Sequence, residues 1–263
     1  EPATTLVHVY PDADEIGRVF RPALGIVAGP AAFAGALGGL RPAGAPRWSV
    51  WTRDARADYV ANLEPSPYDG ALDMGRALAE LRDRLPRDTI VTLDAGNHTG
   101  WPMRYLVFGR PGRLLGPISG AMGYGAPSAI AASLLHPDRL VVGFVGDGGF
   151  LMSGQELATA VQHGARPILC VFNNASYGTI RMHQERDYPG RAIATELVNP
   201  DFVALARAFG AHGELVTRTA EFLPAFDRAV AAGKPALIEL RTDPQQITTR
   251  STLAALRAAR KPS

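Results

Sequence analysis

Cysteine is almost absent from the sequence. The 263 residues contain only Cys170, which lies within the apolar run PILCVF. A single cysteine excludes an intrachain disulfide, and a thiol inside such a run is expected to be buried and inert. This cysteine usage suits a reducing compartment, so we expect a cytoplasmic protein.

Long hydrophobic runs and an excess of one charge are also lacking. No apolar stretch approaches the roughly 20 residues of a membrane span, and no secretory signal sequence opens the chain. The 27 Lys and Arg nearly balance the 25 Asp and Glu, and the basic residues are scattered. We therefore expect neither a membrane nor a nucleic-acid partner. The one extended basic stretch, RSTLAALRAARKPS (250–263), is expected to form a solvated terminal helix.

An initiating methionine is missing as well. Glu1 is followed at once by the strand-like TTLVHVY, so we expect a piece of a longer protein. The chain is nevertheless long enough, and with 46% hydrophobic residues apolar enough, to bury a full core.

Segments with helical and strand-like patterns alternate along the chain. Residues 1–45 look like a small βαβα remnant with part of a Pro-, Gly- and Arg-rich linker (41–51), and residues 46–263 like a larger domain. Its apolar segments are rich in Val, Ile and Leu on both faces, which favours an α/β fold with a doubly wound, mostly parallel sheet and helices on both faces. We predict strands at 6–10, 24–28, 89–96, 139–145, 167–172 and 236–242, and helices at 14–19, 31–40, 70–84, 125–135, 154–163, 200–209 and 219–232.

Polar side chains follow two of these strands in the stretch GDGGFLMSGQELATAVQHGARPILCVFNN. Asp147 comes directly after the run RLVVGFV, and Asn173 and Asn174 follow PILCVF. Consecutive parallel strands deliver their carboxyl ends to one sheet edge, where ligands bind in such folds. We therefore expect Asp147 and Asn174 to lie within reach of one ion.

A carboxylate and an amide oxygen, without nearby Cys or His, favour Mg²⁺ or Ca²⁺ over zinc. Gly146, Gly148 and Gly149 allow close backbone approach and can present N–H groups to an anion. Together they indicate a metal-bound diphosphate. The alternative is a plain turn in which the Asn pair caps the next segment. Ser153 and Glu156 are expected to start a helix that ends at Gly164, which explains Glu156 without catalysis.

GDG followed by NN at this spacing resembles the signature of thiamine diphosphate enzymes related to acetohydroxyacid synthase and pyruvate decarboxylase. The chain looks like the C-terminal, diphosphate-binding part of an acetolactate synthase-like large subunit. The resemblance implies thiamine diphosphate and Mg²⁺ as cofactors. It implies side-chain metal ligands at Asp147 and Asn174, a backbone carbonyl ligand at Ser176, and Gly146, Gly148 and Gly149 beside the diphosphate.

Two upstream segments extend the resemblance. SGAMGYGAPSAIAAS, with Gly120 and Met122, is similar to the family's glycine-rich segment, in which the residue at Met122 supports the bent cofactor. DAGNHTGW resembles the loop after the first strand of the cofactor domain, which implies that Asn97 and His98 lie near the active centre. The alternatives are a core methionine and a structural histidine.

The stretch ASYGTIRMHQERDYPGRAIAT resembles the family's helix beside cofactor and substrate. This implies a cofactor contact at Gly178 and substrate-side candidates at Tyr177, Ile180, Arg181 and His183. Pyruvate decarboxylases carry a glutamate at the position of Ile180, and biosynthetic acetohydroxyacid synthases a tryptophan at that of His183.

The general likeness of YGTIRMHQE favours the acetolactate synthase type, in which a 2-keto acid is decarboxylated and joined to a second carbonyl compound. A benzoylformate- or pyruvate-type decarboxylase stays open. The alternative for Tyr177 and Ile180 is helix packing, and Arg181 and Glu185 are spaced for a surface ion pair.

In the family a glutamate of the N-terminal, pyrimidine-binding domain activates the cofactor, and nothing here corresponds to that domain. Glu1, Glu15 and Glu64 lie in the remnant or the linker. We therefore expect the chain alone to be inactive, and the parent to be a homodimer or homotetramer; whether the parent holds FAD stays open.

Two other functions were considered. The first is a noncatalytic binding or assembly module of the same fold. A nicotinamide-binding domain is disfavoured because GIVAGPAAFAGALGGL lacks G-x-G-x-x-G.

Overall fold

The computed structural model describes residues 3–41, 44–109 and 113–259. Glu1, two residues of the expected linker and the last four of the expected terminal helix lie outside this part. The chain divides into two compact units, Glu1–Asp58 and Tyr59–Ser263, and each is described by itself. The predicted boundary after residue 45 stays a prediction.

The first unit contains a two-stranded parallel sheet. Strands β1 (Val7–Tyr10) and β2 (Leu24–Val27) pair over four residues, and α1 (Pro30–Gly38) follows. The helix expected at 14–19 is wrong: only a 3-10 turn, Ala13–Glu15, forms there. None of the described residues of this unit is buried.

The linker prediction needs a correction as well. The expected linker ends in the helix α2 (Ser49–Asn62), in which no residue is buried. The Pro- and Gly-rich residues before Ser49 gave no indication that a helix starts there. The boundary between the two units, after Asp58, falls within helix α2.

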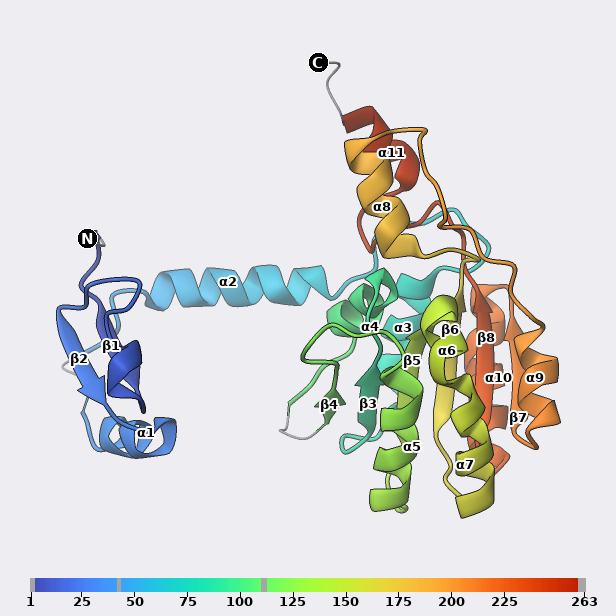
Figure 1. The fold of residues 1–263 in the computed structure, drawn as a ribbon, viewed down its shortest axis with the longest axis horizontal. Coiled ribbons are helices and arrows are strands. Elements are labelled where there is room, and N and C mark those ends of the chain that lie inside the picture. The colour runs from blue at the N-terminus through green and yellow to red at the C-terminus, as the bar shows by residue number, and fades with distance from the viewer. Residues whose placement is uncertain (1–2, 42–43, 110–112, 260–263) are drawn as a thin grey trace. The chain divides into compact units, whose positions relative to one another are not determined.

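The second unit is a doubly wound α/β domain, as predicted (Figure 1). Its six strands lie in the order β4-β3-β5-β6-β8-β7, and every neighbouring pair is parallel. The strands are β3 (Ile90–Leu93), β4 (Leu114–Leu115), β5 (Val141–Gly146), β6 (Ile168–Asn173), β7 (His212–Val216) and β8 (Ala236–Arg241).

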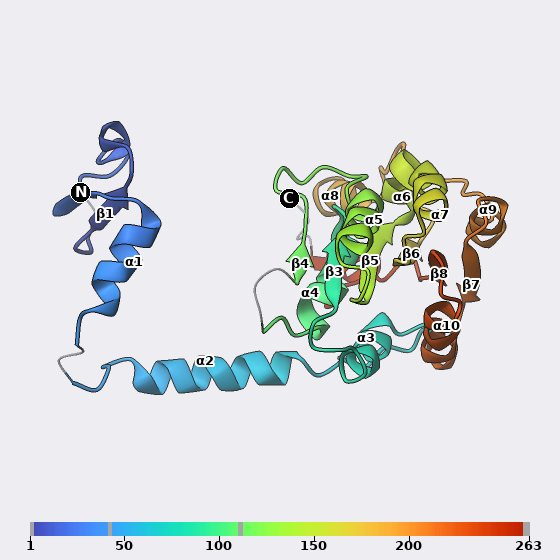
Figure 2. The ribbon, with the colours of Figure 1, turned by 90° about the horizontal axis from the view of Figure 1, so that it is seen from below.

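Helices cover both faces of this sheet (Figure 2). One face carries α3 (Met74–Arg82), α4 (Gly100–Tyr105) and α10 (Thr219–Ala231), and the other α5 (Gly125–Leu135), α6 (Asp147–Ser153), α7 (Leu157–His163) and α9 (Phe202–Ala208). Two 3-10 turns, η2 (Asn97–Thr99) and η3 (Gly154–Glu156), join elements. Helices α8 (Gly178–Asp187) and α11 (Leu253–Ala259) pack against each other beyond one end of the sheet (Figure 1).

Alternate side chains of the central strands supply two separate cores. In β5, Val142 and Phe144 face the cluster under α3 and α10, whereas Val141 and Val145 face the cluster under α5 and α9. Cys170 of β6 lies in the first cluster as a buried free thiol, as expected, and its burial raises the pKa of the thiol. Burial on both faces explains why these strands read as continuous apolar runs.

The predicted helix start at Ser153 is wrong. Helix α6 already begins at Asp147, directly after β5, and Ser153 donates its hydroxyl to the Gly123 carbonyl (2.8 Å) instead of capping a helix. Glu156 accepts from Thr159 Oγ1 at 2.8 Å, and Gly164 ends α7 in the left-handed region as predicted.

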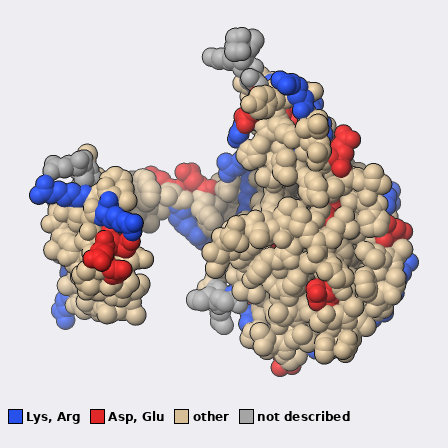
Figure 3. Space-filling view, in the orientation of Figure 1, with Lys and Arg blue, Asp and Glu red and all other residues tan. Residues whose placement is uncertain are grey.

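No helix in the described ranges is long and apolar enough to cross a membrane. On the face of the second unit shown in Figure 3, acidic and basic side chains are interspersed among a larger uncharged surface.

Candidate functional site

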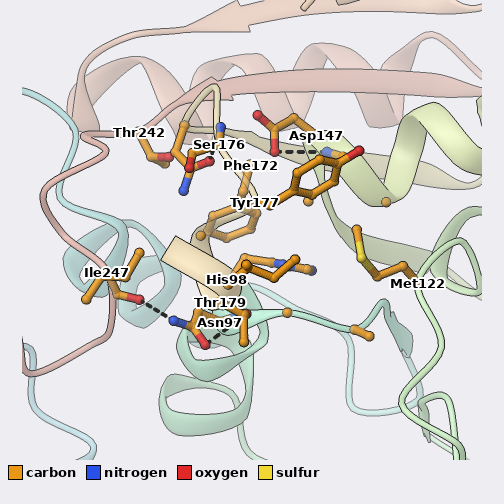
Figure 4. Close-up of a pocket in the computed structure, with 18 of the residues that line it drawn as sticks. Asn97, His98, Met122, Asp147, Phe172, Ser176, Tyr177, Thr179, Thr242 and Ile247 are labelled. Atoms are coloured by element: carbon orange, nitrogen blue, oxygen red, sulfur yellow. Dashed lines mark hydrogen bonds between the residues drawn. The ribbon is translucent and has the colours of Figure 1, made fainter. Parts of the chain in front are cut away.

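A pocket lies where β3, β5, β6 and β8 end, on the carboxyl edge of the sheet (Figure 4). Its walls come from the segments that follow these four strands, together with one residue of the loop before α5 and one of α3. The lining residues are Met74, Ala95, Gly96, Asn97, His98, Trp101, Met122, Gly146, Asp147, Gly148, Gly149, Phe172, Asn174, Ser176, Tyr177, Gly178, Thr179, Ile180, Thr242, Gln246 and Ile247.

The three residues expected to hold a metal line this one pocket. Strands β5 and β6 are direct neighbours, with Gly146 opposite Phe172, so Asp147 and Asn174 follow adjacent strand ends. Asn174 Oδ1 accepts the Ser176 amide at 3.0 Å, which folds the intervening residue, Ala175, into a turn with a φ of 53°. The residues thus share one pocket at adjacent strand ends, and their roles as ligands of one ion stay predictions.

Asp147 is a buried carboxylate, with 3% of its surface exposed. Its Oδ1 accepts the Gly148 amide at 2.9 Å and its Oδ2 the side-chain amide of Asn199 at 2.8 Å. Burial raises the pKa of Asp147, and these hydrogen bonds oppose that rise only in part. No Lys or Arg of the described residues forms an ion pair with Asp147. A divalent cation would supply the missing counter-charge.

Glycines permit the close packing around Asp147. A Cβ on Gly148 would lie 2.5 Å from Cε1 of Tyr177, and one on Gly149 would lie 2.7 Å from Oδ2 of Asp94. At Gly146 the nearest atom would be Nδ1 of His98, at 3.1 Å. The predicted glycines therefore lie in the pocket wall where a Cβ would clash with neighbouring side chains.

Met122 projects into the pocket from the loop before α5 (Figure 4). This loop is fastened by Asp94, a buried residue whose two carboxyl oxygens accept the Gly123 amide at 2.9 and 3.1 Å. Gly120, grouped with Met122 in the prediction, lies outside the pocket and lines a neighbouring hollow that also contains Met122.

Asn97 and His98 both line the pocket, but only the Asn97 side chain has its hydrogen-bonding groups paired. Asn97 donates to the Ile247 carbonyl (3.1 Å) and accepts from Thr179 Oγ1 (3.0 Å), so its side chain ties three segments together (Figure 4). Burial lowers the pKa of His98 to about 4, which keeps its ring neutral near pH 7. The His98 Nε2 atom is buried and has no hydrogen-bond partner in the described part of the chain.

Only part of α8 faces the site. Tyr177, Gly178 and Ile180 line the pocket, as the prediction requires. His183 is exposed and does not line it, so the structure gives no support to a substrate contact there. Arg181 points its Nε at Oε1 of Glu185, at 3.0 Å, and also lies outside the pocket wall.

The ion pair expected from Arg181 and Glu185 forms at 3.0 Å, but its expected place at the surface is wrong. Glu185 is completely buried, and its carboxylate accepts from Arg181, from Arg257 of α11 (Nε to Oε2, 2.7 Å) and from the Gly190 amide. Arg257 is the main reason that the pKa of Glu185 falls to about 2.

Several residues of the site were not predicted from the sequence. Asp94 carried a readable signal, because it follows β3 directly, as Asp147 follows β5. Asn199 and Thr179 carried none, since their roles depend on contacts with Asp147 and Asn97, distant in the sequence. The wall formed by Thr242, Gln246 and Ile247 was missed because the segment after β8 has no motif.

The sequence is similar to known thiamine pyrophosphate enzymes. Residues 94–240 match the family described as "Thiamine pyrophosphate enzyme, C-terminal TPP binding domain". The acetolactate synthase large subunit of Parasynechococcus marenigrum is 36% identical over 177 residues, which are 65% of this chain and 28% of that protein.

A putative acetolactate synthase large subunit of Mycobacterium tuberculosis is 31% identical over 256 residues, 91% of this chain and 43% of that protein. The sulfoacetaldehyde acetyltransferase of Castellaniella defragrans is 35% identical over 158 residues, 60% of this chain and 26% of that protein. The chain thus spans less than half the length of these curated relatives. Because the matched region covers more than half of the chain, with most of the sheet and most of the pocket wall, the chain belongs to the thiamine pyrophosphate enzyme family, through its C-terminal, cofactor-binding domain.

Proposed function

We propose that this chain is the diphosphate- and metal-binding part of an enzyme that decarboxylates a 2-keto acid and joins the product to a second carbonyl compound. The observation that carries the proposal is the convergence of Asp147, Asn174 and Ser176 in one pocket at neighbouring strand ends. The similarity to acetolactate synthase large subunits supports the reaction type.

The residues around Asp147 fit a magnesium diphosphate. The side chains of Asp147 and Asn174 and the carbonyl of Ser176 would hold Mg²⁺, a cation that prefers oxygen ligands. Gly148 and Gly149 line the same pocket without side chains of their own, so their backbone could lie beside the diphosphate. When bound, thiamine diphosphate supplies the carbanion chemistry that the protein's own side chains lack.

The remaining walls would orient the cofactor and the substrate. Met122 offers a polarizable side chain to support the cofactor rings. His98, neutral near pH 7, presents its free Nε2 as a hydrogen-bond acceptor. Tyr177 and Ile180 are then the substrate-side residues.

In the family, cofactor activation needs a glutamate in addition to the metal ligands. No glutamate is among the described residues that line the pocket. We infer that the activating glutamate comes from another domain of a cytoplasmic homodimer or homotetramer. The chain alone should then give no turnover of pyruvate above background, and clear turnover would refute this inference.

The metal assignment can be tested by titrating thiamine diphosphate and Mg²⁺ into the complete protein that carries this chain. Asp147→Ala should weaken binding by more than about 100-fold, since loss of outer partners alone typically costs 10–100-fold. Asp138→Ala is the matched control, because this exposed carboxylate lies at the opposite end of β5. Equal affinity of Asp147→Ala and the wild type for thiamine diphosphate and Mg²⁺ would refute the metal assignment.

A simple decarboxylase is the second candidate, and product analysis separates the two. In the family, pyruvate decarboxylases have a glutamate where Ile180 lines this pocket, which favours carboligation here. The complete protein, given a panel of 2-keto acids, should form carboligation products. Aldehyde as the only product would favour the decarboxylase, and cofactor binding without turnover the noncatalytic module.

A further inference from the structure

A chain of hydrogen bonds crosses the carboxyl edge of the sheet and ends on Asp147. It starts at Glu239 of β8, whose Oε1 accepts Nδ2 of Asn173 at 2.9 Å. Asn173 Oδ1 accepts Nδ2 of Asn199 at 2.8 Å, and the same Nδ2 donates to Asp147 Oδ2 at 2.8 Å. The chain thus joins β8, β6 and the segment before α9 to the start of α6.

The two carboxylates fix the direction of both amides. Asn199 Nδ2 lies between two acceptors, and a reversed amide would place oxygen against oxygen at both contacts. Asn173 is fixed in the same way, because its Nδ2 faces Glu239 and its Oδ1 also accepts the Ala175 amide at 3.1 Å. Arg241 donates to the same Glu239 oxygen at 3.1 Å and so holds that end.

Both ends of this chain of hydrogen bonds are buried, and two of its acceptors are unsatisfied. Glu239 is 1% exposed and Asp147 3%, while the two asparagines are half-buried. Glu239 Oε2 and Asn199 Oδ1 have no partner in the described ranges. Buried unsatisfied polar atoms cost stability, so stability alone does not account for this network.

We propose that Asn199 is a positioning residue that aims the Asp147 carboxylate at the metal, and that Asn173 and Glu239 hold Asn199 in place. The inference rests on the proposed metal site and deepens it. It gives a task to the first asparagine of the NN pair. Through the Ala175 amide, Asn173 also holds the turn that carries Asn174 and Ser176, so one network aligns all three expected oxygen ligands.

The test measures Mn²⁺ affinity by electron paramagnetic resonance in the complete protein with thiamine diphosphate present. Asn199→Ala should weaken Mn²⁺ binding 10–100-fold, the usual effect of losing a partner of a metal ligand. Glu239→Leu should weaken it in the same direction. Glu239→Gln should bind Mn²⁺ about as tightly as the wild type, because the chain of hydrogen bonds needs an acceptor for Asn173 at this position and not a charge.

The double variant separates a connected chain from two independent losses. If Asn199 acts through one network, Asn199→Ala and Glu239→Leu together should weaken Mn²⁺ binding by less than the product of the single effects. Unchanged Mn²⁺ affinity in Asn199→Ala, or equal losses in Glu239→Leu and Glu239→Gln, would overturn the proposal. If Asn199→Ala does not fold, the comparison of the two Glu239 variants decides.

Asp147→Ala serves as the reference for the metal site itself. Loss of Mn²⁺ binding in Asp147→Ala with full affinity in Asn199→Ala refutes the positioning role alone. Full affinity in Asp147→Ala refutes the metal site, and with it the proposed function. Melting temperatures of all variants show whether a change in affinity follows from a general loss of stability.

Discussion

Gly149 lies against a carboxylate that has little freedom to move. Asp94 accepts the Ala95 amide at 2.7 Å and the Gly123 amide at 2.9 Å, and a Cβ on Gly149 would approach its Oδ2 to 2.7 Å. Gly148 faces the ring of Tyr177, a partly exposed side chain that can turn away. The two glycines therefore differ in how strictly the fold requires them.

We expect Gly149→Ala to lower the free energy of unfolding by about 1–3 kcal/mol, the usual cost of overpacking a well-packed site. Urea denaturation of the wild type and the variant measures this change. Gly116→Ala is the control, since a Cβ there would meet nothing within 4 Å. A loss in Gly149→Ala no larger than in Gly116→Ala would show that the contact with Asp94 does not set the effect.

At this scale the sequence predicts residues whose function follows from their place beside a strand end. Asp147 and Asn174 were found because each follows an apolar run. Asn199 was not, because its role exists only once the segment before α9 folds back onto Asp147. The same limit hid the burial of Glu185, since the charge that compensates it comes from Arg257, 72 positions away.

Helices α8 and α11 are held together by that buried carboxylate. Arg257 of α11 donates both Nε and a terminal nitrogen to Glu185 of α8. Helix α8 begins in the pocket wall, at Gly178, and the segment that precedes α11 supplies Ile247 to the same wall. The ion pair therefore fastens two parts of the candidate site from behind.

The contribution of Glu185 to stability should depend on pH. Its pKa is about 2 in the folded protein, against an ordinary 4.5, so the unfolded chain binds more protons between these values. The stabilisation is present above about pH 4.5 and is lost as the pH falls toward 2. Melting temperatures at pH 3 to 7 should show that the deficit of Glu185→Gln relative to wild type shrinks with acid.

Glu196→Gln provides the comparison, because the Glu196 side chain is 89% exposed and only 3.7 Å from the same Arg181. Its melting temperature should follow the wild type at every pH. A deficit of Glu185→Gln that stays constant from pH 3 to 7 would mean that the loss is one of packing and not of charge.

Element boundaries were predictable where local chemistry marks them. Helix α5 has the predicted bounds, Gly125–Leu135, because a glycine-rich turn precedes it and His136-Pro137 ends it. Helix α6 was not predicted, because Ser153 and Glu156 imitate a capping box for the segment 154–163, while the chain already turns helical at Asp147. Strand β7 was not predicted because it lies at the edge of the sheet, and its sequence, HGELV, contains polar residues and no continuous apolar run.

In the whole molecule, all fully buried side chains of the described ranges belong to the second unit. The first unit pairs two short strands and buries none of its described residues, and such a pair is at best marginally stable by itself. Helix α2, where the units divide, buries none of its residues. Folding stability should therefore reside in residues 59–263.

We expect a protein of residues 59–263 to unfold cooperatively, at a melting temperature within a few degrees of that of the 263-residue chain. Calorimetry of both proteins measures the difference. Residues 1–58 alone should show no cooperative transition. A large drop in the melting temperature of the truncated protein would show that the sheet domain depends on the first unit.

Nearly all of the pocket wall lies at or after the carboxyl ends of strands, with Met74 of α3 as the exception, and the described connections at the other edge contribute no lining residue. The turns at 136–140, 164–167 and 232–235 join helices to the strands that follow them, so a whole strand separates each of these turns from the pocket. Such turns are free to vary in length, or to accept new chain ends by circular permutation, without touching the chemistry. Proteins built on this sheet can thus change how their chain is connected and which reaction they catalyse independently, because the connections and the pocket lie at opposite edges of the sheet.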